Sequence, residues 1–91
     1  MSNGVVDNGR GRYEMQVEDG TAFVSYRRAD GIVDLLHAEV PSHLEGRGFG
    51  AQLVQGTLEL ARQNGDKVRP ICSFVVAYFR RHPEYRDLLA P

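Results

Sequence analysis

The chain has 91 residues, of which 42% are hydrophobic and 25% are charged, and its formal net charge is −1. That length fits one small domain and excludes a second core, while the near balance of charges argues against a nucleic-acid partner. Because the chain has one cysteine, three scattered histidines and no apolar run of about eighteen residues, we expect no disulfide framework, metal site or membrane contact, and a cytoplasmic location.

The N-terminal half predicts a flexible tail and then an antiparallel meander. Residues 1–11 are rich in glycine and asparagine and offer little to bury, so we expect a single domain over 12–91. Alternating apolar residues over 13–18 and 21–27 predict two strands joined by a turn at Asp19-Gly20. A second turn over 29–31 leads into a third strand over 32–40, which ends before Pro41.

The C-terminal half predicts a crossover helix, one parallel strand and a closing helix. Apolar residues at helical spacing between Gly50 and Ala61 predict a helix that ends at Asn64-Gly65. A short strand over 67–71 then lies parallel to the third strand. Pro70 cannot donate a backbone hydrogen bond, so this strand is unpaired on one side, lies at an edge or splays from its neighbour. A helix over 74–81 completes an α+β fold.

The segment from Glu45 to Ala51 lies between the third strand and the crossover helix and carries three glycines. Glycines let successive backbone N–H groups point into one concavity, and the N-terminus of a helix favours an anion, so the segment suits a phosphate group. A purely structural turn is about as common an explanation. The dinucleotide-binding fingerprint fits poorly, and the Gly-Lys-Ser/Thr of a P-loop is absent.

The order of elements around this turn resembles the core of the GNAT superfamily of acyl-CoA-dependent N-acetyltransferases. Their pyrophosphate motif, Q/R-x-x-G-x-G/A, is similar to residues 45–50, with Glu45 where Gln or Arg is usual. More narrowly, residues 13–89 resemble a branch of very short GNAT-like proteins through Cys-Ser-Phe-Val at 72–75 and His-Pro-Glu-Tyr at 82–85. The resemblance implies a minimal GNAT-like fold.

The resemblance also implies a site for acetyl-CoA or free coenzyme A, where the third and last strands splay apart. The pantetheine arm would lie on the free backbone near Val40. The pyrophosphate would lie on the turn from Gly46 to Ala51, here called the glycine turn, with the side chain of Glu45 pointing away. The residues implied in cofactor binding are Val40, Gly46, Arg47, Gly48, Phe49, Gly50, Ala51, Ser73, Arg81 and Tyr85.

Three residues are candidates for catalysis. Cys72 ends the last strand and precedes a helix, and the resemblance implies that it accepts the acyl group or lies near the coenzyme thiol; a buried, inert cysteine is the alternative. His37 and Glu39 share one face of the third strand, where a base would take the proton of an amine. An exposed sheet face explains Glu39 about equally well and explains His37 better.

The closing helix departs from the pattern of the larger family. Those enzymes carry an Asn after the last strand and, about seven residues later, a Tyr that protonates the departing thiolate. Phe74 and Arg81 stand at those places here, which leaves Tyr78 or Tyr85 as replacements. We expect acetyl transfer to an amine, directly or through Cys72, with a non-catalytic CoA-binding module as the alternative and a ligand-free structural domain ranked last. The acceptor is unknown; a peptide or protein would suit an open site.

Overall fold

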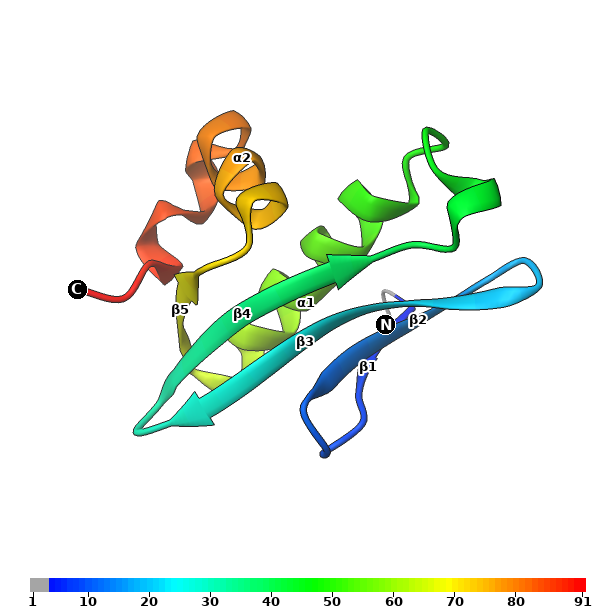
Figure 1. Cartoon of the computed structure of the whole chain (residues 1–91). Helices are drawn as coiled ribbons and strands as arrows, with labels where there is room; N and C mark the ends of the chain where they lie inside the picture. Colours follow the sequence, from blue (N-terminus) through cyan, green and yellow to red (C-terminus); the bar gives the residue numbers. More distant parts are fainter. Residues whose placement is uncertain (1–3) are drawn as a thin grey trace.

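Strands in the order β1-β2-β3-β4-β5 form one mixed sheet in the computed structural model, which describes residues 4–91 (Figure 1). The antiparallel strands are β1 (Val5–Asp7), β2 (Arg12–Val17), β3 (Gly20–Ala29) and β4 (Ile32–Glu39). Strand β5 (Lys67–Pro70) pairs parallel to β4. The predicted α+β class, with a meander followed by one parallel strand, is therefore confirmed.

Helix α1 (Phe49–Asn64) forms the crossover and packs behind the sheet, where it contacts all five strands (Figure 1). Its buried face includes Leu53, Leu58 and Ala61, and Gly65 ends it with a left-handed backbone, as the sequence predicts. Helix α2 (Ser73–Arg81) and two short 3-10 helices, η1 (Ser42–Leu44) and η2 (Pro83–Leu88), complete the chain. On the opposite face of the sheet the side chains are exposed or half-buried.

The sheet begins earlier in the chain than predicted. Val5 is only 3% exposed and pairs with Met15, and the Tyr26 hydroxyl donates a hydrogen bond to Asp7 Oδ1 at 2.6 Å. The prediction that the domain starts near Arg12, after a tail over 1–11, is therefore wrong for this segment; residues 1–3 of that tail lie outside the described residues. A three-residue strand is too short to show a period, and the Tyr26 hydroxyl that bonds Asp7 comes from 19 residues further along the chain.

The two hairpin turns differ in how well the sequence locates them. Ala29 pairs with Ile32, so Asp30 and Gly31 are the central residues, and their φ angles of 55° and 76° are those a type I′ turn requires. In the first hairpin Val17 pairs with Gly20, which moves the turn one residue earlier than predicted, to Glu18 and Asp19. A Cβ at position 20 would lie 3.1 Å from Pro41 Cγ, a tight contact that favours glycine there.

A polar cluster centred on Arg28 joins β1, β2 and β3 to the turn after α1. The Arg28 Nη2 atom lies 3.3 Å from Asp7 Oδ2, 3.3 Å from Asp66 Oδ2 and 3.0 Å from the Tyr13 hydroxyl. Burial raises the pKa of Tyr13 to about 12, because the charged phenolate is poorly solvated there. The cluster therefore fixes the N-terminal edge of the sheet with a neutral tyrosine and a shared cation.

Strands β4 and β5 part after four residue pairs. Their register ends at Leu35 and Pro70, where the Leu35 carbonyl accepts hydrogen bonds from the N–H groups of Ile71 at 3.0 Å and Cys72 at 3.1 Å. Next to this point Ser25 pairs with His37 and Tyr26 pairs with Leu35, so Leu36 is an extra residue that forms a β-bulge on β4. Within the described part of the chain, residues 36–39 have no partner on β5, which confirms the predicted splay.

Candidate functional site

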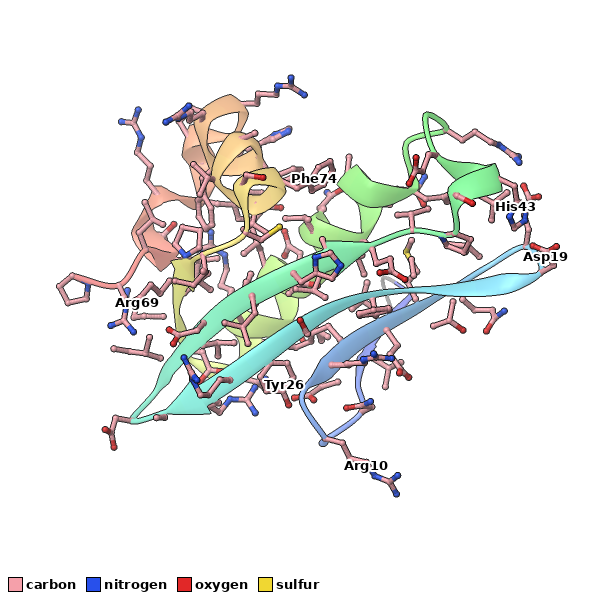
Figure 2. The ribbon with its side chains drawn as sticks, viewed as in Figure 1. Arg10, Asp19, Tyr26, His43, Arg69 and Phe74 are labelled. Carbon is pink, nitrogen blue, oxygen red and sulfur yellow. The ribbon has the colours of Figure 1, made fainter. Side chains whose placement is uncertain are left out.

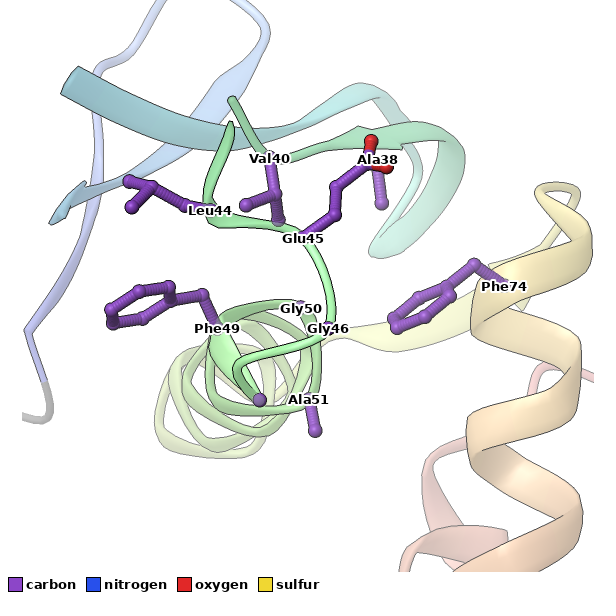
Figure 3. Close-up of a pocket in the computed structure, with 10 residues that line it drawn as sticks. Ala38, Val40, Leu44, Glu45, Gly46, Phe49, Gly50, Ala51 and Phe74 are labelled. Carbon is purple, nitrogen blue, oxygen red and sulfur yellow. The ribbon is translucent and has the colours of Figure 1, made fainter. Parts of the chain in front are cut away.

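A pocket of about 420 Å³ opens beside the part of β4 that has left β5 (Figure 3). This volume falls in the range of small-ligand sites. The lining comes from the end of β4, the glycine turn, the start of α1 and the first turn of α2: Ala38, Val40, Leu44, Glu45, Gly46, Gly48, Phe49, Gly50, Ala51 and Phe74.

The glycine turn forms one end of the pocket. Gly46 and Gly48 have φ angles of 82° and 85°, and no atom outside their own neighbourhood lies within 4 Å of a Cβ built on either. The backbone conformation, rather than crowding, therefore favours glycine at both positions. Gly48 is the N-cap of α1 and supplies no side-chain hydrogen bond, so the first N–H groups of the helix lack a side-chain cap. This arrangement suits an anion.

Phe74 forms the opposite wall and packs against the first turn of α1. A Cβ on Gly50 would lie 2.8 Å from Phe74 Cζ, so the absence of a side chain allows the close approach. The ring is 46% exposed, a high value for a phenylalanine, and points from α2 toward the turn (Figure 3). Glu45, expected to point away, lines the pocket instead, and its side chain extends toward Ala38.

An ion pair and a hydrogen bond connect the tip of the β2–β3 hairpin to the glycine turn and to η1, which precedes it. Arg47 pairs with Glu18, and its guanidinium lies 5.5 Å from the centre of the Phe49 ring. His43 Nε2 lies 2.8 Å from Asp19 Oδ1, and this hydrogen bond lowers the pKa of the Asp19 carboxyl (Figure 2). The side chain of Arg47 is therefore held outside the pocket lining.

The residues implied in cofactor binding fall into two groups. Those that line the pocket are Val40, Gly46, Gly48, Phe49, Gly50 and Ala51. Arg47, Ser73, Arg81 and Tyr85 do not line it. Tyr85 is only 5% exposed and donates a hydrogen bond to Glu59 Oε2 at 2.6 Å; burial and this bond raise the pKa of its hydroxyl. Ser73 and Arg81 are exposed at the two ends of α2.

The candidate catalytic residues also lie outside the lining. Cys72 is half-buried at the N-cap of α2. His37 and Glu39 share the exposed face of β4, where His37 Nε2 lies 3.2 Å from Glu39 Oε1. Tyr78 is 7% exposed and stacks on His82 with ring centres 4.0 Å apart, and burial raises its pKa.

Four of the residues that line the pocket have no role there that the sequence predicts: Ala38, Leu44, Glu45 and Phe74. Ala38 lies two residues before Val40, so strand alternation alone could have placed both on one face. Phe74 carried no such signal, because its position depends on how α2 packs on α1. Among residues 4–91, no group of three His, Cys, Asp or Glu side chains is arranged to hold a metal ion, and no helix is long and apolar enough to cross a membrane.

Comparison with known proteins gives three results. A family model described as GCN5-related N-acetyl-transferase matches residues 12–88. Protein NATD1 of Mus musculus is 32% identical over 62 residues, which cover 66% of this chain and 56% of the relative. Protein NATD1 of Homo sapiens is also 32% identical over 62 residues, which cover 55% of that protein. The chain thus spans little more than half the length of these curated relatives. The NMR solution structure of a GCN5-like protein from Staphylococcus aureus superposes with a TM-score of 0.71 at 27% identity, covering 99% of this chain and 91% of that one.

Proposed function

The chain belongs to the GCN5-related N-acetyltransferase family, and from this membership we propose that it binds acetyl-CoA in the pocket beside β4 and transfers the acetyl group to an amine. The observation that carries the proposal is the uncapped start of α1, preceded by two left-handed glycines, at one end of a 420 Å³ pocket. An anionic pyrophosphate suits those N–H groups.

The rest of the pocket suits a pantetheine arm. Ala38, Val40 and Phe74 offer an apolar wall, and the backbone of β4 beyond Leu35 has no strand partner on β5 within the described residues. An extended, amide-containing chain there would pair with the strand edge much as a peptide does. The negative charge of Glu45 would weaken the binding of a phosphate by about 1 kcal/mol at ~4 Å in water.

In the proposed reaction, the amine nitrogen forms a bond to the acetyl carbon while the carbon–sulfur bond breaks. The amine proton goes to a base, for which Glu39 and His37 are the candidates on β4; because both lie on the sheet face opposite the pocket, the amine would approach from that face, through the gap between β4 and β5. In the relay version, the Cys72 thiol gives its proton to solvent and its sulfur forms a bond to the acetyl carbon as the carbon–sulfur bond to CoA breaks; the amine then attacks this new thioester and Cys72 leaves as a thiolate. The thiolate that leaves takes a proton from solvent, since a thiol holds its proton near neutral pH and the Tyr85 hydroxyl donates to Glu59.

A non-catalytic CoA-binding module is the second candidate. It is favoured by one observation, that Cys72, His37 and Glu39 all lie outside the pocket lining. The acceptor distinguishes the two candidates, because a module has none. A peptide or protein amine is the acceptor class we propose for the enzyme, since the sheet face that carries His37 and Glu39 is exposed.

Calorimetric titration with acetyl-CoA tests binding, and mass spectrometry of peptide amines incubated with protein and acetyl-CoA tests transfer. Heat of binding together with a mass gain of one acetyl group on a peptide supports the enzyme. Heat without transfer supports the module, and no heat at millimolar ligand overturns both. Cys72→Ala separates the two routes, because full activity in that variant excludes the relay.

A further inference from the structure

The tip of the β2–β3 hairpin reaches across to the glycine turn. Its two central residues are both acidic, and each pairs with a basic residue of the opposite segment: Glu18 with Arg47 and Asp19 with His43. Figure 2 shows Asp19 and His43 side by side at this end of the molecule. The two contacts bracket Leu44, Glu45 and Gly46, three residues that line the pocket.

The Glu18–Arg47 pair is open to solvent. The Arg47 and Glu18 side chains are 52% and 46% exposed, so water screens their attraction and the bond exchanges at little cost. Three carboxylates, from Glu18, Asp19 and Glu45, surround the turn, and the guanidinium of Arg47 is already paired with one of them, Glu18. A polyanionic ligand therefore meets a turn whose one permanent positive charge is already neutralised.

Resting on the proposed binding of acetyl-CoA, we propose that Glu18 is a positioning residue that competes with the phosphates of the ligand for Arg47. In the structure the guanidinium is engaged by Glu18 and lies beside Phe49, outside the lining. Ligand binding exchanges this carboxylate for a phosphate, which also accepts the planar fork of an arginine. Glu18 thereby lowers the affinity for phosphate-bearing ligands without touching them.

Isothermal titration of isosteric variants with two ligands tests this competition. Acetyl-CoA carries the phosphates, whereas S-acetylpantetheine has the same thioester and arm without them. E18Q is expected to bind acetyl-CoA about two- to fivefold more tightly than wild type, the range for an exposed ion pair, and S-acetylpantetheine equally well. D19N is the matched control. It also removes a negative charge from the tip of the β2–β3 hairpin, but Asp19 pairs with His43 and not with Arg47, so we expect a smaller gain in affinity for acetyl-CoA.

Variants of Arg47 complete a double-mutant cycle with E18Q. R47Q is expected to weaken acetyl-CoA binding, and adding E18Q to R47Q is expected to restore little, because the competition needs the guanidinium. Unchanged or weaker binding by E18Q overturns the inference, as does an equal gain with S-acetylpantetheine or in the R47Q background. These outcomes leave the proposed function intact, whereas absence of acetyl-CoA binding by the wild-type protein overturns both. Equal melting temperatures establish that the variants fold.

Discussion

Replacing Arg28 with methionine should destabilise the fold far more than the same change at its neighbour Arg27. Methionine keeps the apolar stem but leaves the Asp66 side chain, which is 10% exposed, and the buried Tyr13 hydroxyl without their guanidinium partner. A buried polar group without a partner costs about 1–3 kcal/mol, and loss of the more exposed bond to Asp7 adds up to about 1 kcal/mol. We expect R28M to lose about 2–3 kcal/mol of unfolding free energy, which lowers the melting temperature by about 10–20 °C in a domain of this size.

Urea unfolding followed by circular dichroism measures this loss, with R27M as the control. The Arg27 side chain is 73% exposed and lies 3.6 Å from Asp34, so R27M should lose less than about 1 kcal/mol. Adding D66N to R28M should recover part of the stability, because it removes the buried, unpaired charge. Equal losses for the two arginine variants, or no recovery with D66N, would refute the reasoning.

The remaining predictions concern the pocket and the effect of pH. G48A should lose about 1–2 kcal/mol in urea unfolding and bind acetyl-CoA more weakly, because φ is 85° at that position; wild-type stability would contradict the backbone argument. G50A should push the Phe74 ring outward and cost stability in the wild-type background but not in F74A, so an additive double-mutant cycle would show that the two do not touch. Burial opposes ionisation of Asp7, yet hydrogen bonds from Tyr26, Gly9 and Arg28 outweigh it and lower its pKa below 3.8. The stability that Asp7 contributes over D7N should therefore be complete above pH 3.8 and disappear as the pH falls below it; an acid-independent difference would refute the shift.

Local chemistry made most of the fold predictable. Asp30 and Gly31 occur at a turn that needs two positive φ angles, and Gly65 stands where a helix must end in a left-handed backbone. The first hairpin was misplaced by one residue because Gly20 packs closely against Pro41 instead of serving as a central turn residue, and turn statistics do not contain that contact. Strand β1 was missed because its three residues are too few to show an alternation and because its bond to Tyr26 joins residues that are 19 apart in sequence.

Only part of the candidate site could be predicted from the sequence. The glycine turn is a local pattern, and the structure places it at the pocket. The bulge at Leu36 has no local signature, yet it reverses the alternation of β4, so that His37 and Glu39 lie on the face opposite buried Leu35 while Ala38 and Val40 line the pocket. Phe74 reaches the pocket through packing of α2 on α1, which depends on Gly50 in another segment.

The double hydrogen bond on the Leu35 carbonyl makes the gap between β4 and β5 a property of the main chain. Two successive N–H groups, of Ile71 and Cys72, converge on one oxygen, so the second donor turns back instead of continuing the ladder. No side chain takes part in this bond. Substitutions in the walls of the pocket, for example at Ala38 or Phe74, are therefore expected to change its shape while the opening between the strands persists.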